Sequence, residues 1–83
     1  MPSFEDKQTA MHARHSIAKT PADISELNIS CAKGVVELSG KLKRPRGFVG
    51  NFSVRKEFEI MQVSIRLVHG VKDVVADRVE LLD

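Results

Sequence analysis

The chain has 83 residues, a size that fits one small domain. A hydrophobic content of 42% and a charged content of 29% are ordinary for a folded protein and exclude a disordered or fibrous class. The formal net charge of +2 is too small to indicate a nucleic-acid partner by itself, and a single cysteine excludes an internal disulfide.

The first predicted element is a helix over residues 3–19. Ser3 with Asp6 three positions later is a loose capping-box pattern. The segment ends at Thr20-Pro21, because the residue before a proline is pushed out of the helical region. At helical spacing, small residues and one isoleucine form the apolar stripe: Ala10, Ala13 and Ile17. We expect this helix to lie close against its neighbours.

Residues 24–42 predict a hairpin of two half-buried strands. Apolar residues alternate with polar or small ones in 27–32 and again in 34–40, and the second strand can continue to Leu42. Lys33-Gly34 separates the two runs, and a two-residue loop with glycine second is typical of a hairpin turn. The resulting register gives the pair one apolar face: Leu27, Ile29, Cys31, Val36 and Leu38.

The segment 43–51 is irregular and basic. A proline and two glycines exclude regular structure, and Phe48 with its neighbour Val49 lies between the glycines, at a loop tip. Basic residues beside an apolar tip suit an anionic membrane surface, and the candidate site is Lys41, Lys43, Arg44, Arg46 and Phe48. The alternative is that Phe48 folds back against the next helix while the cations are solvated.

Residues 52–69 predict a second helix, capped by Asn51 or Ser53. One apolar stripe is expected to face the sheet: Val54, Phe58, Met61, Ile65 and Val68. A second stripe, which one sheet cannot also cover, is a candidate partner interface: Phe52, Ile60, Val63 and Leu67. Either the first helix covers it, or a partner or a second copy of this chain does. Alternating β-branched residues also allow a strand, but the length without a breaker favours a helix.

Residues 71–83 predict the last strand. Val75, Val79 and Leu81 are expected to line the core. Asp77 interrupts this alternation, so we expect a β-bulge or a late start of the strand.

Groups that could carry chemistry are sparse. His12 and His15 share the water side of the first helix, and no Cys or carboxylate completes an obvious metal-ligand set with them. Cys31 falls on an inner strand face, where a buried, inert thiol is expected. Gly47-x-x-Gly50 lacks the lysine and hydroxyl of a nucleotide site. We therefore expect no enzyme, no cofactor and no metal.

Core and turn residues form a spaced pattern that reads Leu27-x-Ile29-x-Cys31-x-x-Gly34-Val35-Val36-x-Leu38-x-Gly40 and, after a helix, Gly70-Val71-x-x-Val74-Val75. This pattern resembles the BON domain, a small bacterial module linked to osmotic stress and membranes. The resemblance covers residues 24–82, and the leading helix fits too. It implies a single domain with an α+β fold, αββαβ, whose two helices pack on one face of a three-stranded mixed sheet. Residues 1–22 would be the N-terminal helix and linker, and 24–82 the core.

The resemblance also implies binding to phospholipid or envelope proteins without catalysis. With the basic loop, it leads us to expect a binding module for anionic phospholipid or a membrane-associated protein. The alternative is a protein-interaction or self-assembly module, hence a homo-oligomer, that uses the second stripe of the 52–69 helix. Single-stranded nucleic acid is disfavoured, because Phe48 is the one stacking candidate and the charge is modest.

The sequence also bears on location. No stretch reaches the roughly 18 apolar residues of a membrane span. Residues 1–7 have no apolar signal core. We therefore expect a cytoplasmic chain, or a periplasmic or membrane-attached domain if the sequence is a part of a longer protein.

Overall fold

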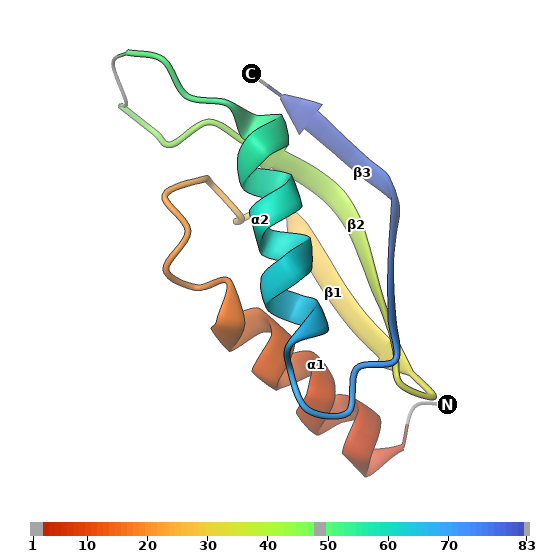
Figure 1. Cartoon of the computed structure of the whole chain (residues 1–83). Helices are drawn as coiled ribbons and strands as arrows, with labels where there is room; N and C mark the ends of the chain where they lie inside the picture. Colours follow the sequence, from red (N-terminus) through yellow and green to blue (C-terminus); the bar gives the residue numbers. More distant parts are fainter. Residues whose placement is uncertain (1–2, 48–49, 83) are drawn as a thin grey trace.

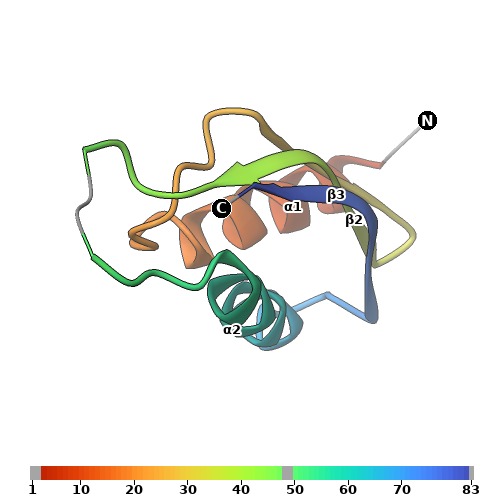
Figure 2. The same cartoon turned by 90° about the horizontal axis from the view of Figure 1, so that it is seen from above.

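A computed structural model describes residues 3–47 and 50–82 of the chain. Five elements follow in the order α1 (Phe4–Ser16), β1 (Leu27–Ala32), β2 (Val35–Lys43), α2 (Val54–Arg66) and β3 (Asp73–Leu82). The strands form one sheet in which β1 is antiparallel and β3 parallel to the central β2. Both helices lie on the same face of this sheet (Figures 1 and 2). The predicted α+β fold with αββαβ order is confirmed.

The β1–β2 hairpin has the predicted register along its whole length, from the turn to Leu27 opposite Gly40. The turn residues Lys33 and Gly34 both have positive φ, of 53° and 83°. Two successive positive φ angles are the requirement of a two-residue type I′ turn. On the predicted apolar face Ile29 is half-buried, and the other side chains are buried: Leu27, Cys31, Val36 and Leu38.

The first turn of α1 carries the predicted capping box. Ser3 Oγ accepts a hydrogen bond from the Asp6 amide at 3.1 Å, and the Asp6 carboxylate accepts one from the Ser3 amide at 3.3 Å. The same carboxylate accepts hydrogen bonds from the amides of Lys33 and Gly34, at 3.0 Å and 3.2 Å. A side chain expected to cap a helix therefore also fastens that helix to the hairpin turn.

Both helices are shorter than predicted. α1 ends at Ser16 instead of residue 19, and α2 covers Val54–Arg66 instead of 52–69. After α2 the amides of Leu67 and Val68 bond to carbonyls three residues earlier, at 3.3 Å and 3.0 Å, a tighter turn that ends the α-helical pattern. Ser53, one of the two predicted caps, is the N-cap of α2, and the alternative of a strand in this segment is wrong.

β3 contains the predicted β-bulge. Where β2 advances from Glu37 to Ser39, β3 advances by one residue more. The additional residue reverses which side chains face the helices: Val74 is buried before the bulge, and Val79 packs against the core after it. The expectation that Val75 lines the core is therefore wrong, because Val75 pairs with Glu37 on the helix-free face.

The core lies between the sheet and the helices, and every element contributes to it. Its buried side chains are mostly aliphatic: Ala13, Ile17, Ala22, Leu27, Cys31, Val36, Leu38, Leu42, Val54, Met61, Ile65 and Val74. Within the described part of the chain, no helix lies on the opposite face of the sheet (Figure 2). The basic loop lies at the end of the sheet where β2 leads into α2.

Candidate functional site

The loop between β2 and α2 lies at the same end of the molecule as the N-terminus of α2 (Figure 1). Arg44 spans the base of this loop, because its Nη2 donates a hydrogen bond to the carbonyl of Gly50 at 2.7 Å. Phe48, predicted at the loop tip, lies outside the described residues. Among the described residues of the loop, the hydrogen bond from Arg44 to Gly50 holds the two ends of the loop together and keeps a cation at its base.

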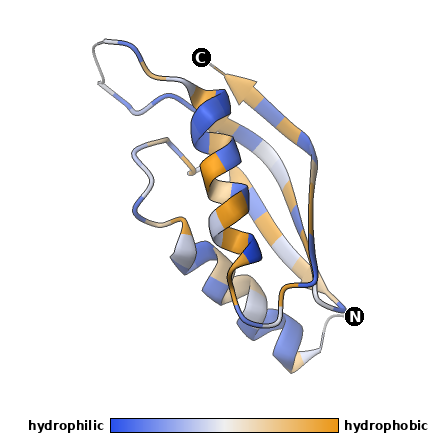
Figure 3. Ribbon diagram, viewed as in Figure 1, coloured by the Kyte–Doolittle hydropathy of each residue, from blue (hydrophilic) through white to orange (hydrophobic). Residues whose placement is uncertain are grey.

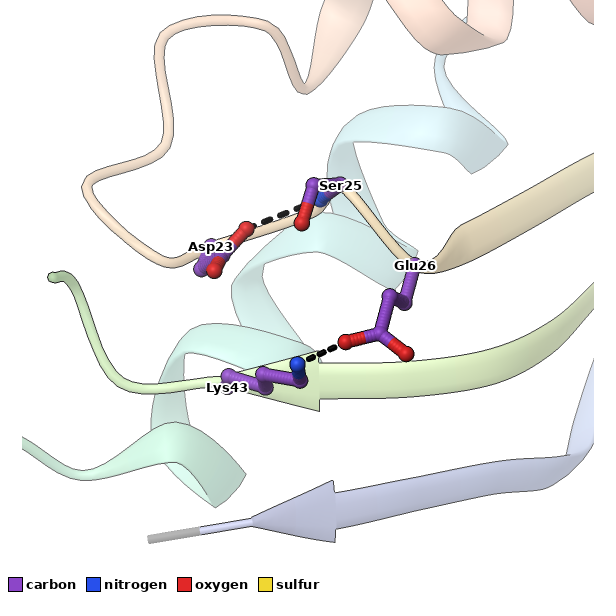
Figure 4. A network of polar contacts seen from close by, with 4 residues as sticks. All are labelled: Asp23, Ser25, Glu26 and Lys43. Carbon is purple, nitrogen blue, oxygen red and sulfur yellow. Dashed lines mark hydrogen bonds and ion pairs between the residues drawn. The ribbon is translucent and has the colours of Figure 1, made fainter.

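Lys43 is engaged within the protein (Figure 4). Its backbone pairs with that of Asp23 through hydrogen bonds of 2.9 Å and 3.2 Å, which tie the linker before β1 to the end of β2. Its Nζ forms an ion pair with the carboxylate of Glu26. Lys43 thus fastens two segments together, and part of its charge is already compensated.

Arg46 is exposed and lines a shallow hollow together with Asp23. Hydrogen bonds from Ser25, one of them from its amide at 2.9 Å, hold the pKa of Asp23 below its usual value (Figure 4). The charges of Lys43 and Arg46 lower that pKa further. Asp23 is therefore ionised at neutral pH and offsets some of the positive charge on this side of the loop.

A second shallow hollow, of about 570 Å³, lies on the other side of the loop at the start of α2. The described residues that line it are Arg44, Gly50, Asn51, Phe52, Ser53 and Lys56. Two of these residues are cations, and none of them is acidic. The first turn of a helix also carries the positive end of the helix dipole, which favours an anion nearby. This hollow is therefore the place in the basic region where an anionic group meets the least opposing charge.

Two cations of α2, Arg55 and Lys56, are not among the predicted site residues. Both are exposed in the first helical turn, where the helix dipole disfavours positive charge. The sequence does contain the signal: residues 41–56 include six Lys or Arg of the thirteen in the chain, and no Asp or Glu. We call residues 41–56 the cationic segment.

The structure brings together only part of the predicted basic set. Arg44 from the loop meets Lys56 from α2 at the second hollow. Lys41 lies apart from them, exposed on the sheet and level with Glu80 of the neighbouring strand. The cations available at this end are thus Arg44 and Arg46 of the loop, with the first turn of α2.

The predicted partner interface is also divided. Ile60, Val63 and Leu67 lie on one side of α2 and are 49%, 57% and 82% exposed. α1 leaves these side chains largely uncovered. Phe52 precedes α2 and is half-buried against the core, so it does not share their surface.

The groups considered for chemistry are scattered. His12 and His15 are exposed, as expected. Cys31 is buried; burial raises the pKa of its thiol, and the hydrogen bond to Asp6 at 3.6 Å raises it further. Among residues 3–47 and 50–82 there is no cluster of three or more His, Cys, Asp or Glu that could hold a metal ion. Within the same ranges no helix is long and apolar enough to cross a bilayer.

Comparisons of this chain with models of known protein families, with curated proteins and with solved structures find no match. The observed αββαβ order is the one that a resemblance to BON domains implies. The function must therefore be inferred from the side chains of the cationic segment and of α2.

Proposed function

We propose that this protein is a non-catalytic module that binds anionic phospholipid at a membrane surface through the cationic segment. One observation carries the proposal: six cations and no acidic residue occupy 41–56, and Arg44 and Lys56 line one hollow at the start of α2. A phosphate headgroup has the charge and the acceptor oxygens that such a hollow accommodates.

The chemistry of the individual groups supports a phosphate ligand. The guanidinium of Arg44 spends one donor on Gly50 and keeps others for an anion, since arginine carries five N–H donors in a planar fork. Lys56 adds a point charge to the lining of the same hollow. Each cation near an anionic membrane surface contributes roughly 1 kcal/mol. Several cations acting together are therefore needed for stable binding.

The same proposal includes family membership: we take the chain to be a BON-like domain. The spaced pattern of residues 27–40 corresponds to the hairpin with its observed register, and the order of helices and strands is the one expected for that family. Membership would favour a bacterial role at membranes or in the response to osmotic stress.

Co-sedimentation with lipid vesicles tests the proposal. We expect binding to vesicles that contain phosphatidylglycerol and none to vesicles of phosphatidylcholine alone. Lys56→Glu should weaken binding by about tenfold or more, because it replaces an attraction of roughly 1 kcal/mol by a repulsion. Lys7→Glu, at an exposed position of α1, makes the same change in net charge outside the lining of the hollow and is the matched control.

The vesicle experiment distinguishes a lipid site at the hollow from a general effect of net charge and from a protein partner. Equal loss in Lys7→Glu and Lys56→Glu would mean that only the net charge matters and would remove the assigned site. Absence of binding to both vesicle types would refute a lipid ligand and leave a membrane-associated protein as the alternative. Binding that is lost only in Lys56→Glu supports the proposal.

A further inference from the structure

The exposed side of α2 carries an apolar stripe flanked by two opposite charges. Ile60, Val63 and Leu67 recur at steps of three and four residues, which places them along one side of the helix, away from the sheet. Figure 3 shows that hydrophobic residues continue along α2 toward its C-terminal end. Three neighbouring apolar side chains with this exposure form an uncovered surface of the kind that marks interaction sites.

Glu59 and Arg66 lie beside this stripe and are both exposed. They are seven residues apart, so they share one flank of the helix and are separated by about 10 Å along its axis. Within residues 3–47 and 50–82 the structure gives neither of them an ion-pair partner. A partner that covers the stripe would therefore meet one negative and one positive charge along the same flank.

We propose that the stripe is covered by the same stripe of a second copy of this chain, with the two α2 helices antiparallel. In a two-fold interface, if residue i of one copy contacts residue j of the other, then j also contacts i. In an antiparallel pair the same flanks of the two helices meet. Glu59 of each copy then faces Arg66 of the other, and two complementary ion pairs form at once.

The positions of the residues agree with this arrangement. The midpoint of Glu59 and Arg66 falls between Gln62 and Val63, and the midpoint of the apolar stripe falls directly after Val63. One two-fold axis near Val63 therefore serves the apolar contact and the ion pairs together. A parallel two-fold pair would instead bring opposite flanks of the two helices together, so Glu59 and Arg66 of the two copies would lie on opposite sides of the interface and could not form these ion pairs.

The size of the stripe limits the strength of the dimer. Stable complexes bury about 800 Å² on each partner. Three apolar side chains per copy are a small interface core by that standard. We therefore expect a reversible dimer whose population rises with protein concentration, and not a permanent one.

Sedimentation equilibrium over a range of concentrations tests the proposal. The mass should rise from 9.2 kDa toward twice that value as concentration increases. Leu67→Lys should abolish the rise. Phe4→Lys, which alters a side chain of α1 that is 74% exposed, is the matched control and should leave it unchanged. A chain that stays monomeric at every concentration, or a dimer unaffected by Leu67→Lys, would overturn the proposal.

Charge reversal tests the antiparallel orientation. Glu59→Arg and Arg66→Glu should each weaken self-association by about tenfold, since each places like charges together at two symmetric positions. An equimolar mixture of these two variants should dimerise again, because every flank contact between the two is complementary. The double variant Glu59→Arg/Arg66→Glu should also dimerise. Failure of both rescues would overturn the antiparallel arrangement.

The two proposals stand independently. Glu59, Arg66 and the apolar stripe lie outside the cationic segment. Vesicle binding by a strictly monomeric protein would refute the dimer alone, and a dimer without affinity for anionic vesicles would refute the lipid site alone.

Discussion

The carboxylate of Asp6, in the first turn of α1, accepts a hydrogen bond of 3.2 Å from the amide of Gly34 in the β1–β2 turn. It accepts a second from Lys33, at 3.0 Å. Lys33 has a φ of 53°, a left-handed conformation that costs a non-glycine residue roughly 1–2 kcal/mol. The two hydrogen bonds help to hold the turn in this conformation, and they make the position of α1 depend on the hairpin.

Asp6→Asn is expected to destabilise the protein. In the wild type the amides of Ser3, Lys33 and Gly34 donate to the two carboxylate oxygens of Asp6. Asparagine has only one side-chain oxygen that can accept, so at least one hydrogen bond to the turn or to the helix cap is lost. The urea concentration at the unfolding midpoint should fall. Asp77→Asn, at an exposed position of β3, is the control and should leave the midpoint nearly unchanged. Equal midpoints for wild type and Asp6→Asn would contradict the role assigned to this carboxylate.

The Asp6 carboxylate should also make stability depend on pH. Hydrogen bonds, chiefly from the Lys33 amide, lower the pKa of Asp6 from 3.8 to about 2. Because the folded state binds this proton less tightly than the unfolded state, the contribution is complete above pH 3.8 and is lost as the pH falls toward 2. The difference in unfolding midpoint between wild type and Asp6→Asn should therefore shrink over this interval. A difference in midpoint that does not change with pH would contradict a lowered pKa of Asp6 in the folded protein.

Lys56→Glu should stabilise the fold while it weakens lipid binding. Ser53 Oγ already accepts the amide of Lys56 at 3.1 Å, and a glutamate at this position completes a capping box. It also places a negative charge at the positive end of the helix dipole, worth about 0.3–1 kcal/mol. Thermal unfolding should show a higher midpoint for this variant. A lower midpoint would mean that Lys56 supports the structure, and its loss of binding could not then be assigned to the ligand.

Gly40 is expected to tolerate substitution far less than Gly47. Both have positive φ, of 100° and 75°. A Cβ at Gly40 would lie 2.2 Å from the carbonyl oxygen of Glu26, whereas one at Gly47 would meet no atom within 4 Å among the described residues beyond its chain neighbours. Gly47→Ala should cost about 1–2 kcal/mol of unfolding free energy from backbone strain alone, and Gly40→Ala clearly more, because backbone must also move. Similar losses in the two variants would show that the close approach to Glu26 is unimportant.

The parts of the fold that follow from local patterns could be predicted from the sequence. Lys33-Gly34 fixed the turn, and the period of two on either side then determined the register of the hairpin. The interruption at Asp77 predicted the bulge in β3. Its consequence for Val74 and Val75 could not be predicted, because the face that each side chain occupies depends on which side of the bulge it lies and on the register with β2.

The candidate site was predictable only in part. The cations of the loop are visible as a cluster in the sequence, but the engagement of Lys43 with Glu26 depends on contacts between segments distant in the chain. Lys56 is not among the predicted site residues, because the sequence places it inside the helix that follows the basic loop. Its proximity to Arg44 arises from the direction in which α2 leaves the loop, which no local pattern encodes.

The dependence of vesicle binding on salt and lipid charge tests the central claim most directly. If the cationic segment binds anionic headgroups, the partition coefficient onto phosphatidylglycerol vesicles should fall steeply as the ionic strength rises from about 0.01 M to about 0.15 M, since the screening length shrinks from about 30 Å to about 8 Å. Binding to phosphatidylcholine vesicles should be absent throughout. Equal binding to both vesicle types, unaffected by salt, would contradict the account.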